Sequence, residues 1–323
     1  MEFFLKDSIQ PSSVKISHYE PVLLAGSCFT ENIGNKLSNF KFKTLANPFG
    51  IIYNPISIVE SILRVKNNKP YSEPEIISNH GKFFSLDHHG SFSQNDKNKC
   101  IQKINDELNF ANKFLLKTNT IIITLGTAWV YEYTEQNKIV ANCHKIPAKK
   151  FNKRLLSVEE TIEKLAELAN EFSEVNIIFS VSPVRHIAEG LHENNISKSV
   201  LHVAINHMIN NFSNCSYFPA YEIVIDELRD YRFYQQDLIH PTQQAIDYVW
   251  KKFSETFFDI PTQKLNEQIE KIQQAANHRP FDFESESHQK FIKTQLINIQ
   301  QLEKKIPFLN FENEKLNLIN KKE

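Results

Sequence analysis

The chain has 323 residues, of which 41% are hydrophobic and 23% are charged, and its formal net charge is −1. This length and apolar content allow a substantial core, in one large α/β domain with an appendage or in two smaller domains. A net charge so close to zero gives no overall attraction to nucleic acid or to an acidic membrane surface, so neither is expected as a partner.

The sequence carries no signal for export or membrane insertion. The first stretch, MEFFLKDSIQPSS, lacks a basic region, a long apolar segment and a cleavage site of small residues. No apolar run approaches the roughly 18 residues that a membrane span needs. The cysteines are widely spaced and form neither a disulfide framework nor a CxxC zinc pattern. We therefore expect a soluble, cytoplasmic protein that uses no metal ion and no cofactor.

Short apolar runs alternate with amphipathic stretches along most of the chain. The runs TIIITL and NIIFSVS are typical of parallel strands covered on both faces. The predicted strands are residues 22–26, 42–46, 120–125, 175–182 and 219–225. The predicted helices are residues 30–38, 55–66, 98–116, 157–172, 194–212 and 242–258, with a capping box at Ser157 and Glu160. This alternation predicts an α/β fold with a three-layer, doubly wound parallel sheet.

Two insertions and an extension interrupt this pattern. Residues 76–92 and 129–143 each look like a β-hairpin, and the second turns near Gln136 and Asn137. After about residue 262 the sequence becomes polar and helical, without a strand pattern. We therefore expect an α/β domain at residues 1–261 and a helical carboxyl-terminal extension at residues 262–323, whose terminal NKKE frays.

Side chains suited to a functional site follow every predicted strand. In open parallel sheets, ligands bind at the carboxyl ends of the strands. The segments in question are GSC at 26–28, NPFG at 47–50, GTAW at 126–129, SPVRH at 182–186 and DLIHPT at 237–242. We expect these segments to surround one cleft.

These segments contain a possible nucleophile, base and acid. Ser27 and Cys28 occupy a strand-to-helix turn, where the helix dipole favours a thiolate of depressed pKa and free N–H groups face a developing oxyanion. Adjacent residues leaving a strand point to opposite sides, so the two are not expected to share the role. Asp237 can orient the ring of His240 and leave its other nitrogen free to act as a base. Pro241 fixes where the histidine leaves the loop.

The ordered motifs GSCF, ENIG, NPFGIIYNP, TLGTAWVY, SPVRH and DLIHPT resemble those of the GSCFA family, which is similar to the SGNH (GDSL-type) hydrolase superfamily. The resemblance runs from about Val22 to Trp250 and leaves the extension unexplained. It implies an SGNH-like, flavodoxin-like sheet. It also implies that Cys28 stands at the nucleophile position, with Asp237 as the acid and His240 as the base.

The same resemblance implies an oxyanion hole that departs from the SGNH pattern. Gly50 falls at the second-block glycine, with Asn47 before it, and Gly126 falls at the start of the third block. The third-block asparagine, which donates to the oxyanion, is replaced by Ala128. We expect the N–H groups of Cys28 and Gly50 to bind the oxyanion, with Asn47 as a candidate third donor. Losing one such donor costs roughly 3–4 kcal/mol of transition-state stabilisation.

Each candidate also has a simpler interpretation. Cys28 could be buried apolar filler, and Ser27 could be either a helix cap or the nucleophile itself. The run DLIHP could mark a helix start, and Gly50 and Gly126 could be turn glycines. Further interpretations concern residues beside these motifs. Arg185 and His186 either contact an anionic group of the substrate or are solvated. Trp129, Tyr131 and Phe49 fit the core as well as a pocket wall.

Two histidine-containing runs remain. His144 is interpreted as structural, and Asp87-His88-His89 lacks a third ligand at a spacing that suits a metal. The expected function is that of an SGNH-like hydrolase or acyltransferase acting on an ester or thioester, an O-acylated carbohydrate among them, through a covalent acyl-enzyme. The alternative is a non-catalytic module that keeps the cleft to bind a ligand. The sequence specifies neither the acceptor nor the oligomeric state.

Overall fold

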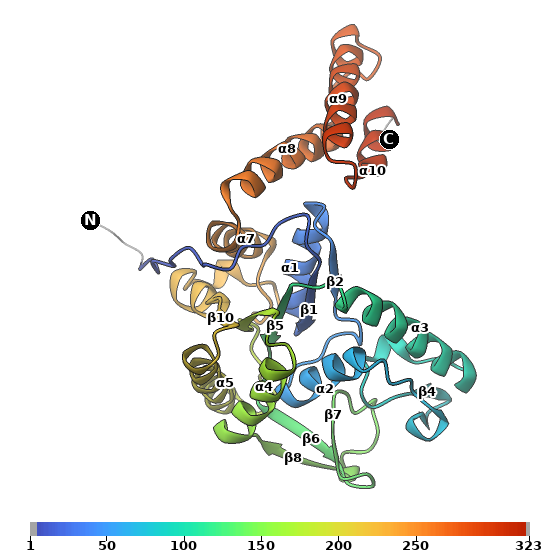
Figure 1. The fold of residues 1–323 in the computed structure, drawn as a ribbon, viewed down its shortest axis with the longest axis vertical. Helices are drawn as coiled ribbons and strands as arrows, with labels where there is room; N and C mark the ends of the chain where they lie inside the picture. The colour runs from blue at the N-terminus through green and yellow to red at the C-terminus, as the bar shows by residue number, and fades with distance from the viewer. Residues whose placement is uncertain (1–4, 321–323) are drawn as a thin grey trace.

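The computed structural model describes residues 5–320, and a five-stranded parallel sheet lies at its centre (Figure 1). The first four residues and the last three lie outside this range. The expectation that the terminal NKKE frays therefore concerns residues that are mostly outside it. The strands are β1 (Val22–Gly26), β2 (Thr44–Ala46), β5 (Thr120–Leu125), β9 (Asn176–Val181) and β10 (Cys215–Tyr217). Their spatial order is β10-β9-β5-β1-β2. If these five strands are renumbered 1 to 5 in chain order, their spatial order is 2-1-3-4-5, which is typical of a doubly wound sheet. The strand order reverses between β1 and β5, so the switch point lies at the carboxyl ends of these two strands.

Alternate residues of the strands face two separate apolar layers. Leu23, Ile121 and Ile123 belong to one buried cluster, and Leu24 and Ile122 belong to the other. Helices α2 (Pro55–Lys66), α3 (Lys97–Leu115), α4 (Val158–Glu171) and α5 (Leu191–Asn211) cover the first face. Helices α1 (Cys28–Asn39) and α7 (Gln243–Phe257) cover the second. The prediction of an α/β sheet covered by helices on both faces is therefore confirmed.

The sequence predicts the start of α4 correctly and the start of α5 less closely. The Ser157 hydroxyl accepts from the N–H of Glu160, and the Glu160 carboxylate accepts from the N–H of Ser157, so the predicted capping box is present at the start of α4. Helix α5 begins three residues before its predicted start, at Leu191, directly after Gly190, whose φ is 93°. A positive φ of this size favours glycine, and it marks the end of the loop that follows β9.

The predicted strand at 219–225 is wrong. The edge strand β10 lies just before it, and the run itself forms α6 (Ala220–Glu222) followed by a π-helical turn (Ile223–Glu227). Ala220, Ile223 and Val224 are fully buried in the second apolar cluster. Their spacing is that of one helix face, and a short apolar run does not distinguish a buried strand from a buried helical turn.

Both predicted hairpins are present. Strands β3 (Ile77–Asn79) and β4 (Lys82–Phe84) form the first, and β6 (Trp129–Tyr133) and β7 (Lys138–Val140) form the second. A strand that the sequence did not indicate, β8 (Phe151–Leu155), pairs antiparallel with β6. Its sequence FNKRL is mostly polar, so only pairing with β6 reveals it as a strand.

The carboxyl-terminal helices are α8 (Ile260–Asn277), α9 (Glu286–Lys305) and α10 (Glu312–Ile319). They share a small apolar cluster of their own that includes Ile269, Ile299 and Phe311. They contact the turn after α1, where Lys41 pairs with Glu314 at 2.7 Å. That turn lies at the end of the sheet opposite the carboxyl ends of the strands, and Figure 1 shows α9 and β8 at opposite ends of the molecule. Within residues 5–320, no helix is long and apolar enough to cross a membrane.

The buried His18 makes stability depend on pH. Its ring stacks on Phe42 at 3.9 Å between centroids, and its Nε2 donates to the Phe40 carbonyl at 3.0 Å. Burial lowers the pKa of His18 from 6.5 to about 4. Above the unfolded pKa both states are neutral and there is no penalty. As the pH falls below it, only the unfolded state gains the proton, so stability falls until the folded pKa is reached.

We expect this histidine alone to remove about 2 kcal/mol of unfolding free energy between about pH 6.5 and about pH 5. Urea unfolding of the wild type and of His18→Gln, which keeps an N–H donor but does not titrate, measures this contribution. The pH dependence of the variant should be smaller by that amount. Equal pH dependence in the two proteins would contradict the assignment.

Candidate active site

A cleft of about 490 Å³ opens at the carboxyl edge of the sheet. Residues that follow four of the parallel strands, β1, β2, β5 and β9, line it, together with the loop before α7 and the hairpin β6–β7. Of the predicted site residues, those on its wall are Cys28, Trp129, Arg185, His186 and His240. Four of the five predicted segments therefore meet at one cleft, whereas the segment at 47–50 contributes no residue to its wall.

The loop before α7 holds Asp237 and His240 as a bonded pair. One carboxylate oxygen of Asp237 accepts from the N–H groups of Ile239 and His240, at 2.9 and 3.0 Å. The other lies 2.6 Å from His240 Nδ1. Leu238, with a φ of 60°, forms the turn that closes this arrangement. The N–H groups of His240 and Ile239, together with the His240 ring, lower the pKa of Asp237 to about 2. Asp237 is thus a carboxylate at neutral pH, and Nε2 of the ring is left for another partner.

Ser27 and Cys28 occupy different environments. Ser27 is fully buried and caps α1, since its hydroxyl accepts from the N–H of Phe29 at 3.3 Å. Its own N–H donates to the Thr124 carbonyl at 3.1 Å, which ties the turn to β5. Cys28 is half-buried, is the first residue of α1 and lines the cleft. The thiol rather than the hydroxyl is therefore at the surface of the cleft.

The expected depression of the Cys28 pKa is wrong. Burial raises the pKa of the thiol and outweighs the backbone N–H groups of Phe29 and Cys28 and the charge of Lys198, which lower it. The carboxylate of Glu31 raises it further. The helix N-terminus therefore only moderates the cost of burying a thiolate. Cys28 is a neutral thiol at rest, and a base must remove its proton before it can attack.

The expected oxyanion donor at Gly50 is also wrong. The Gly50 N–H donates to the Asn47 carbonyl at 2.7 Å and closes a turn, so it is not available to a ligand. Gly50 has a φ of 78°, and a Cβ there would lie 2.3 Å from the Cβ of His89. Asn47 Oδ1 accepts from the Gly26 N–H at 2.9 Å, and neither Asn47 nor Gly50 is on the wall of the cleft. These two residues shape the loop beside Cys28.

Helix α5 and the loop before α2 hold the loop after β5. The Gly126 N–H donates to the Tyr53 carbonyl at 2.8 Å, and a Cβ on Gly126 would lie 3.2 Å from His186 Nε2. Ala128 is fully buried, and its N–H donates to the Ser197 hydroxyl at 2.8 Å. A small residue at Gly126 is therefore needed for the ring of His186 to approach the loop.

Two ring nitrogens of the cleft wall have no hydrogen-bond partner within residues 5–320. They are Nε1 of Trp129 and Nε2 of His186. Burial lowers the pKa of His186 to about 4, so its ring is neutral at pH 7. Both nitrogens are consequently candidates for contact with a ligand, because a buried polar atom without a partner costs free energy.

The rim of the cleft carries both paired and unpaired charge. Lys153 forms an ion pair with Glu189 and lies over the rings of Trp129 and Tyr131 at 5.2 and 5.3 Å from their centroids. Arg185 stacks on Tyr234 at 4.8 Å and has no ion pair within the described part of the chain. Its guanidinium is thus not occupied by a carboxylate there, and contact with an anionic group of the substrate stays a prediction.

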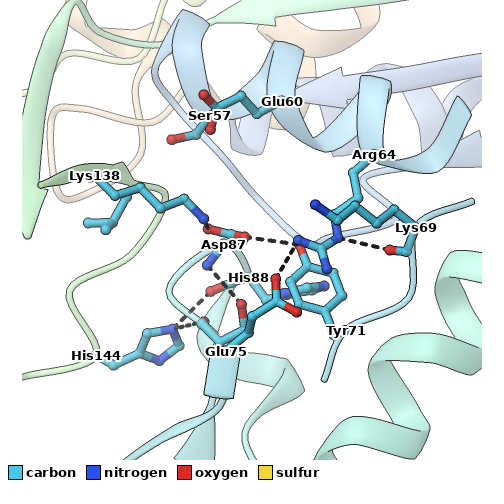
Figure 2. A network of polar contacts seen from close by, with 12 residues as sticks. Ser57, Glu60, Arg64, Lys69, Tyr71, Glu75, Asp87, His88, Lys138 and His144 are labelled. Atoms are coloured by element: carbon cyan, nitrogen blue, oxygen red, sulfur yellow. Dashed lines mark hydrogen bonds and ion pairs between the residues drawn. The ribbon is translucent and has the colours of Figure 1, made fainter. Parts of the chain in front are cut away.

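Asp87 and His88 of the run Asp87-His88-His89 belong to a separate polar network beside α2 (Figure 2). The Asp87 carboxylate accepts from Lys138 at 2.6 Å and from the Tyr71 hydroxyl at 3.1 Å. The ring of His88 is fully buried against Tyr71, and Nε2 of His144 donates to the His88 carbonyl at 3.0 Å. Residues 5–320 contain no group of three or more side chains arranged to hold a metal ion. These contacts fasten the first hairpin to the second, in agreement with a structural role for His144.

The sequence did not single out Lys198, which lies directly beneath the cleft. It is 2% exposed, and its Nζ donates to the carbonyls of Gly126 and Ser182. A signal was available, because Lys198 lies three and seven residues before Leu201 and Ile205 on the buried face of α5. A lysine within such a stripe is rarely fully buried.

The fold and the cleft together define an α/β protein that presents a thiol and a histidine–carboxylate pair at the switch point of its sheet. A family model described as the GSCFA family matches residues 21–253. The chain belongs to the GSCFA family. A second model, described as the GSCFA domain protein, C-terminal domain, matches residues 269–321, which include α9 and α10. A search of curated proteins found no match to the chain. The predicted family is thus confirmed, and the extension has a family model of its own.

Proposed function

We propose that this chain is an acyl hydrolase or acyltransferase, similar to the SGNH hydrolases, that acts on an ester or thioester through a covalent acyl-enzyme. One observation carries the proposal. Asp237 holds Nδ1 of His240 at 2.6 Å, which leaves Nε2 of that ring as a base at the cleft that Cys28 lines. A nucleophile, a base and a group that orients the base are the parts that acyl transfer requires.

The residues act in two steps. Cys28 Sγ attacks the acyl carbon while Nε2 of His240 takes the thiol proton, and the Asp237 carboxylate stabilises the imidazolium. The tetrahedral intermediate collapses to a thioester on Cys28, and the leaving group takes the proton from His240. Water or an acceptor hydroxyl or thiol then attacks this thioester with His240 again as base, and the Cys28 thiol is restored.

Two donors are proposed for the oxyanion in place of Gly50. The first is the N–H of Cys28, which lies in the first turn of α1, where helix N–H groups have no partner within the helix. The second is the unpaired indole N–H of Trp129. Trp129 and Tyr131 also give the cleft an aromatic wall, and Arg185 adds an unpaired cation. An O-acylated carbohydrate or another acyl compound with an anionic group is the substrate class that this wall suits.

Trp129→Phe tests the indole donor. We expect it to lower kcat/KM by about 10-fold or more, because the ring stays and one hydrogen bond to the reacting oxygen is lost. Tyr131→Phe is the matched control, since it removes a polar group from the same wall without touching the proposed donor. If Trp129→Phe retains full kcat/KM, Trp129 is a packing residue.

A non-catalytic ligand-binding module is the second candidate. Ala128 at the third-block position and the occupied N–H of Gly50 favour it, since both reduce the number of oxyanion donors.

Initial rates with short-chain nitrophenyl esters and with acyl thioesters separate the two functions. We expect turnover of both, because nitrophenolate and a thiolate are both good leaving groups. Saturable binding of these compounds without turnover would favour the binding module.

A further inference from the structure

The buried Lys198 is a cation without a carboxylate. Its Nζ donates to Gly126 O at 2.6 Å and to Ser182 O at 2.7 Å, and it forms no ion pair within residues 5–320. Burial of a charge costs several kcal/mol unless it is paired, and two neutral carbonyls compensate it only in part. Burial accordingly lowers the pKa of Lys198 to about 7. An apolar side chain would fill this position at lower cost.

Lys198 lies where its charge reaches the nucleophile. The two carbonyls that it binds belong to the residues directly after β5 and β9, and the loops that continue from them carry Thr127 and His186 into the cleft. The Lys198 ammonium and the Cys28 thiol interact electrostatically, and each lowers the cost of charging the other. The cation is thus directly under the floor of the cleft.

The neighbouring Ser197 provides a neutral comparison. Its hydroxyl accepts from the Ala128 N–H at 2.8 Å and lies 3.0 Å from Thr127 Oγ1. Ser197 and Lys198 therefore hold the same loop, one by a neutral group and one by a charged group. A purely structural function of this part of α5 requires no charge.

We propose that Lys198 is a positioning residue for negative charge: its buried ammonium stabilises the Cys28 thiolate and the oxyanion that forms when Cys28 is acylated. The inference rests on the proposed function in that it takes Cys28 as the nucleophile. It adds a source of positive potential, present while Lys198 is protonated, on the side of the cleft opposite the solvent. In such a site, charge stabilisation acts in a low dielectric and costs no reorganisation during the reaction.

Other titratable groups act on Cys28 or line the same cleft, and they must be distinguished from Lys198. They are Glu31 on its own helix, Tyr53 across the cleft, and His186 and His240 on the cleft wall. Burial raises the pKa of Tyr53 and lowers that of His186 to about 4, so both stay neutral near pH 7. Glu31 is present in every variant. His240 is the base that the proposed function assigns to Cys28, so it requires its own control.

The rate of Cys28 labelling by N-ethylmaleimide, followed by peptide mass spectrometry, measures its thiolate fraction at each pH. With Lys198 present, we expect the logarithm of the rate to rise with pH, level off near neutrality as Lys198 loses its charge, and rise again. In Lys198→Met it should rise without a plateau. The wild type should react about 10-fold faster than this variant at about pH 6 and at the same rate by about pH 9.

Three further variants complete the experiment. Lys198→Gln keeps an N–H donor without the charge, so it supports the fold if Lys198→Met does not, and it should behave like Lys198→Met. Ser197→Ala should retain the wild-type plateau. Proteins with Lys198 and with Lys198→Met are also compared when both carry His240→Gln. The plateau should persist in the protein that keeps Lys198.

Parallel profiles for the wild type and both Lys198 variants would overturn the inference and leave Lys198 with a structural function alone. Loss of the plateau in Ser197→Ala, or in His240→Gln, would overturn it as well. The labelling needs no acyl substrate. A failure of this inference is therefore distinct from a failure of the proposed acyl chemistry, which the turnover measurements test.

Discussion

Asp237→Asn is expected to lower kcat by about 10⁴-fold while leaving the fold intact. The carboxylate fixes Nδ1 of His240 as the protonated nitrogen and stabilises the imidazolium that forms when Cys28 gives up its proton. An amide in its place donates to Nδ1 and favours the wrong tautomer. Because the pKa of Asp237 is lowered to about 2 by the backbone N–H groups of its loop and by the ring, the wild-type carboxylate stays ionised throughout the range in which activity is measured.

Steady-state kinetics with the best ester or thioester, together with thermal unfolding of both proteins, measures this effect. Asp230→Asn is the matched control, since Asp230 caps a neighbouring turn by accepting from the N–H of Arg232 at 2.8 Å and is not on the wall of the cleft. Near wild-type turnover in Asp237→Asn would reduce Asp237 to a loop-capping residue.

Cys28→Ala should lower turnover by about 10⁴-fold or more, the loss typical of removing a nucleophile. Ser27→Ala should instead lower stability, by about 1 kcal/mol, because it removes the cap of α1. Its turnover should fall only a few-fold, through movement of the turn. The fully buried hydroxyl of Ser27 and the cleft-facing thiol of Cys28 are the reason for this difference.

Cys143→Ala is the control for the loss of a thiol from this cleft. Cys143 also lines the wall, and burial raises its pKa to about 11, so it has no route to a thiolate. We expect its turnover to match the wild type within a factor of about two, since nothing in the proposed reaction uses it. Loss of activity in Cys143→Ala together with full activity in Cys28→Ala would reassign the nucleophile.

The sequence was sufficient to predict β1, β5 and β9, the three inner strands of the central sheet, because they are buried on both faces. The run TIIITL is almost entirely apolar for that reason, and such a run can be recognised as a buried strand without knowing how its side chains pack. The edges of the fold were harder. The run at 219–225 is equally apolar as a helical turn, and β8 is polar because it is an edge strand on which Asn152 and Lys153 are exposed. Both depend on contacts with distant elements that periodicity does not encode.

The site was also predicted in part: its location followed from the sequence, but two of its details did not. The rule that ligands bind at the carboxyl ends of parallel strands correctly placed Cys28 at the cleft, because it depends only on topology. His240 reaches the same cleft from the loop before α7, which follows a helical turn and not the strand predicted at 219–225. The role of Gly50 depended on where one N–H points, and the turn with Asn47 takes that group. The pKa of Cys28 depended on how deeply the thiol is buried. Neither hydrogen-bond direction nor depth of burial follows from the order of motifs.

The central claim is that Cys28 carries the acyl group. Intact-mass spectrometry of the protein quenched during turnover of an acyl thioester tests it most directly, with wild type, Cys28→Ala and Ser27→Ala in parallel. We predict an adduct with the mass of the acyl group in the wild type and in Ser27→Ala, and none in Cys28→Ala. An adduct that persists in Cys28→Ala and disappears in Ser27→Ala would contradict the account.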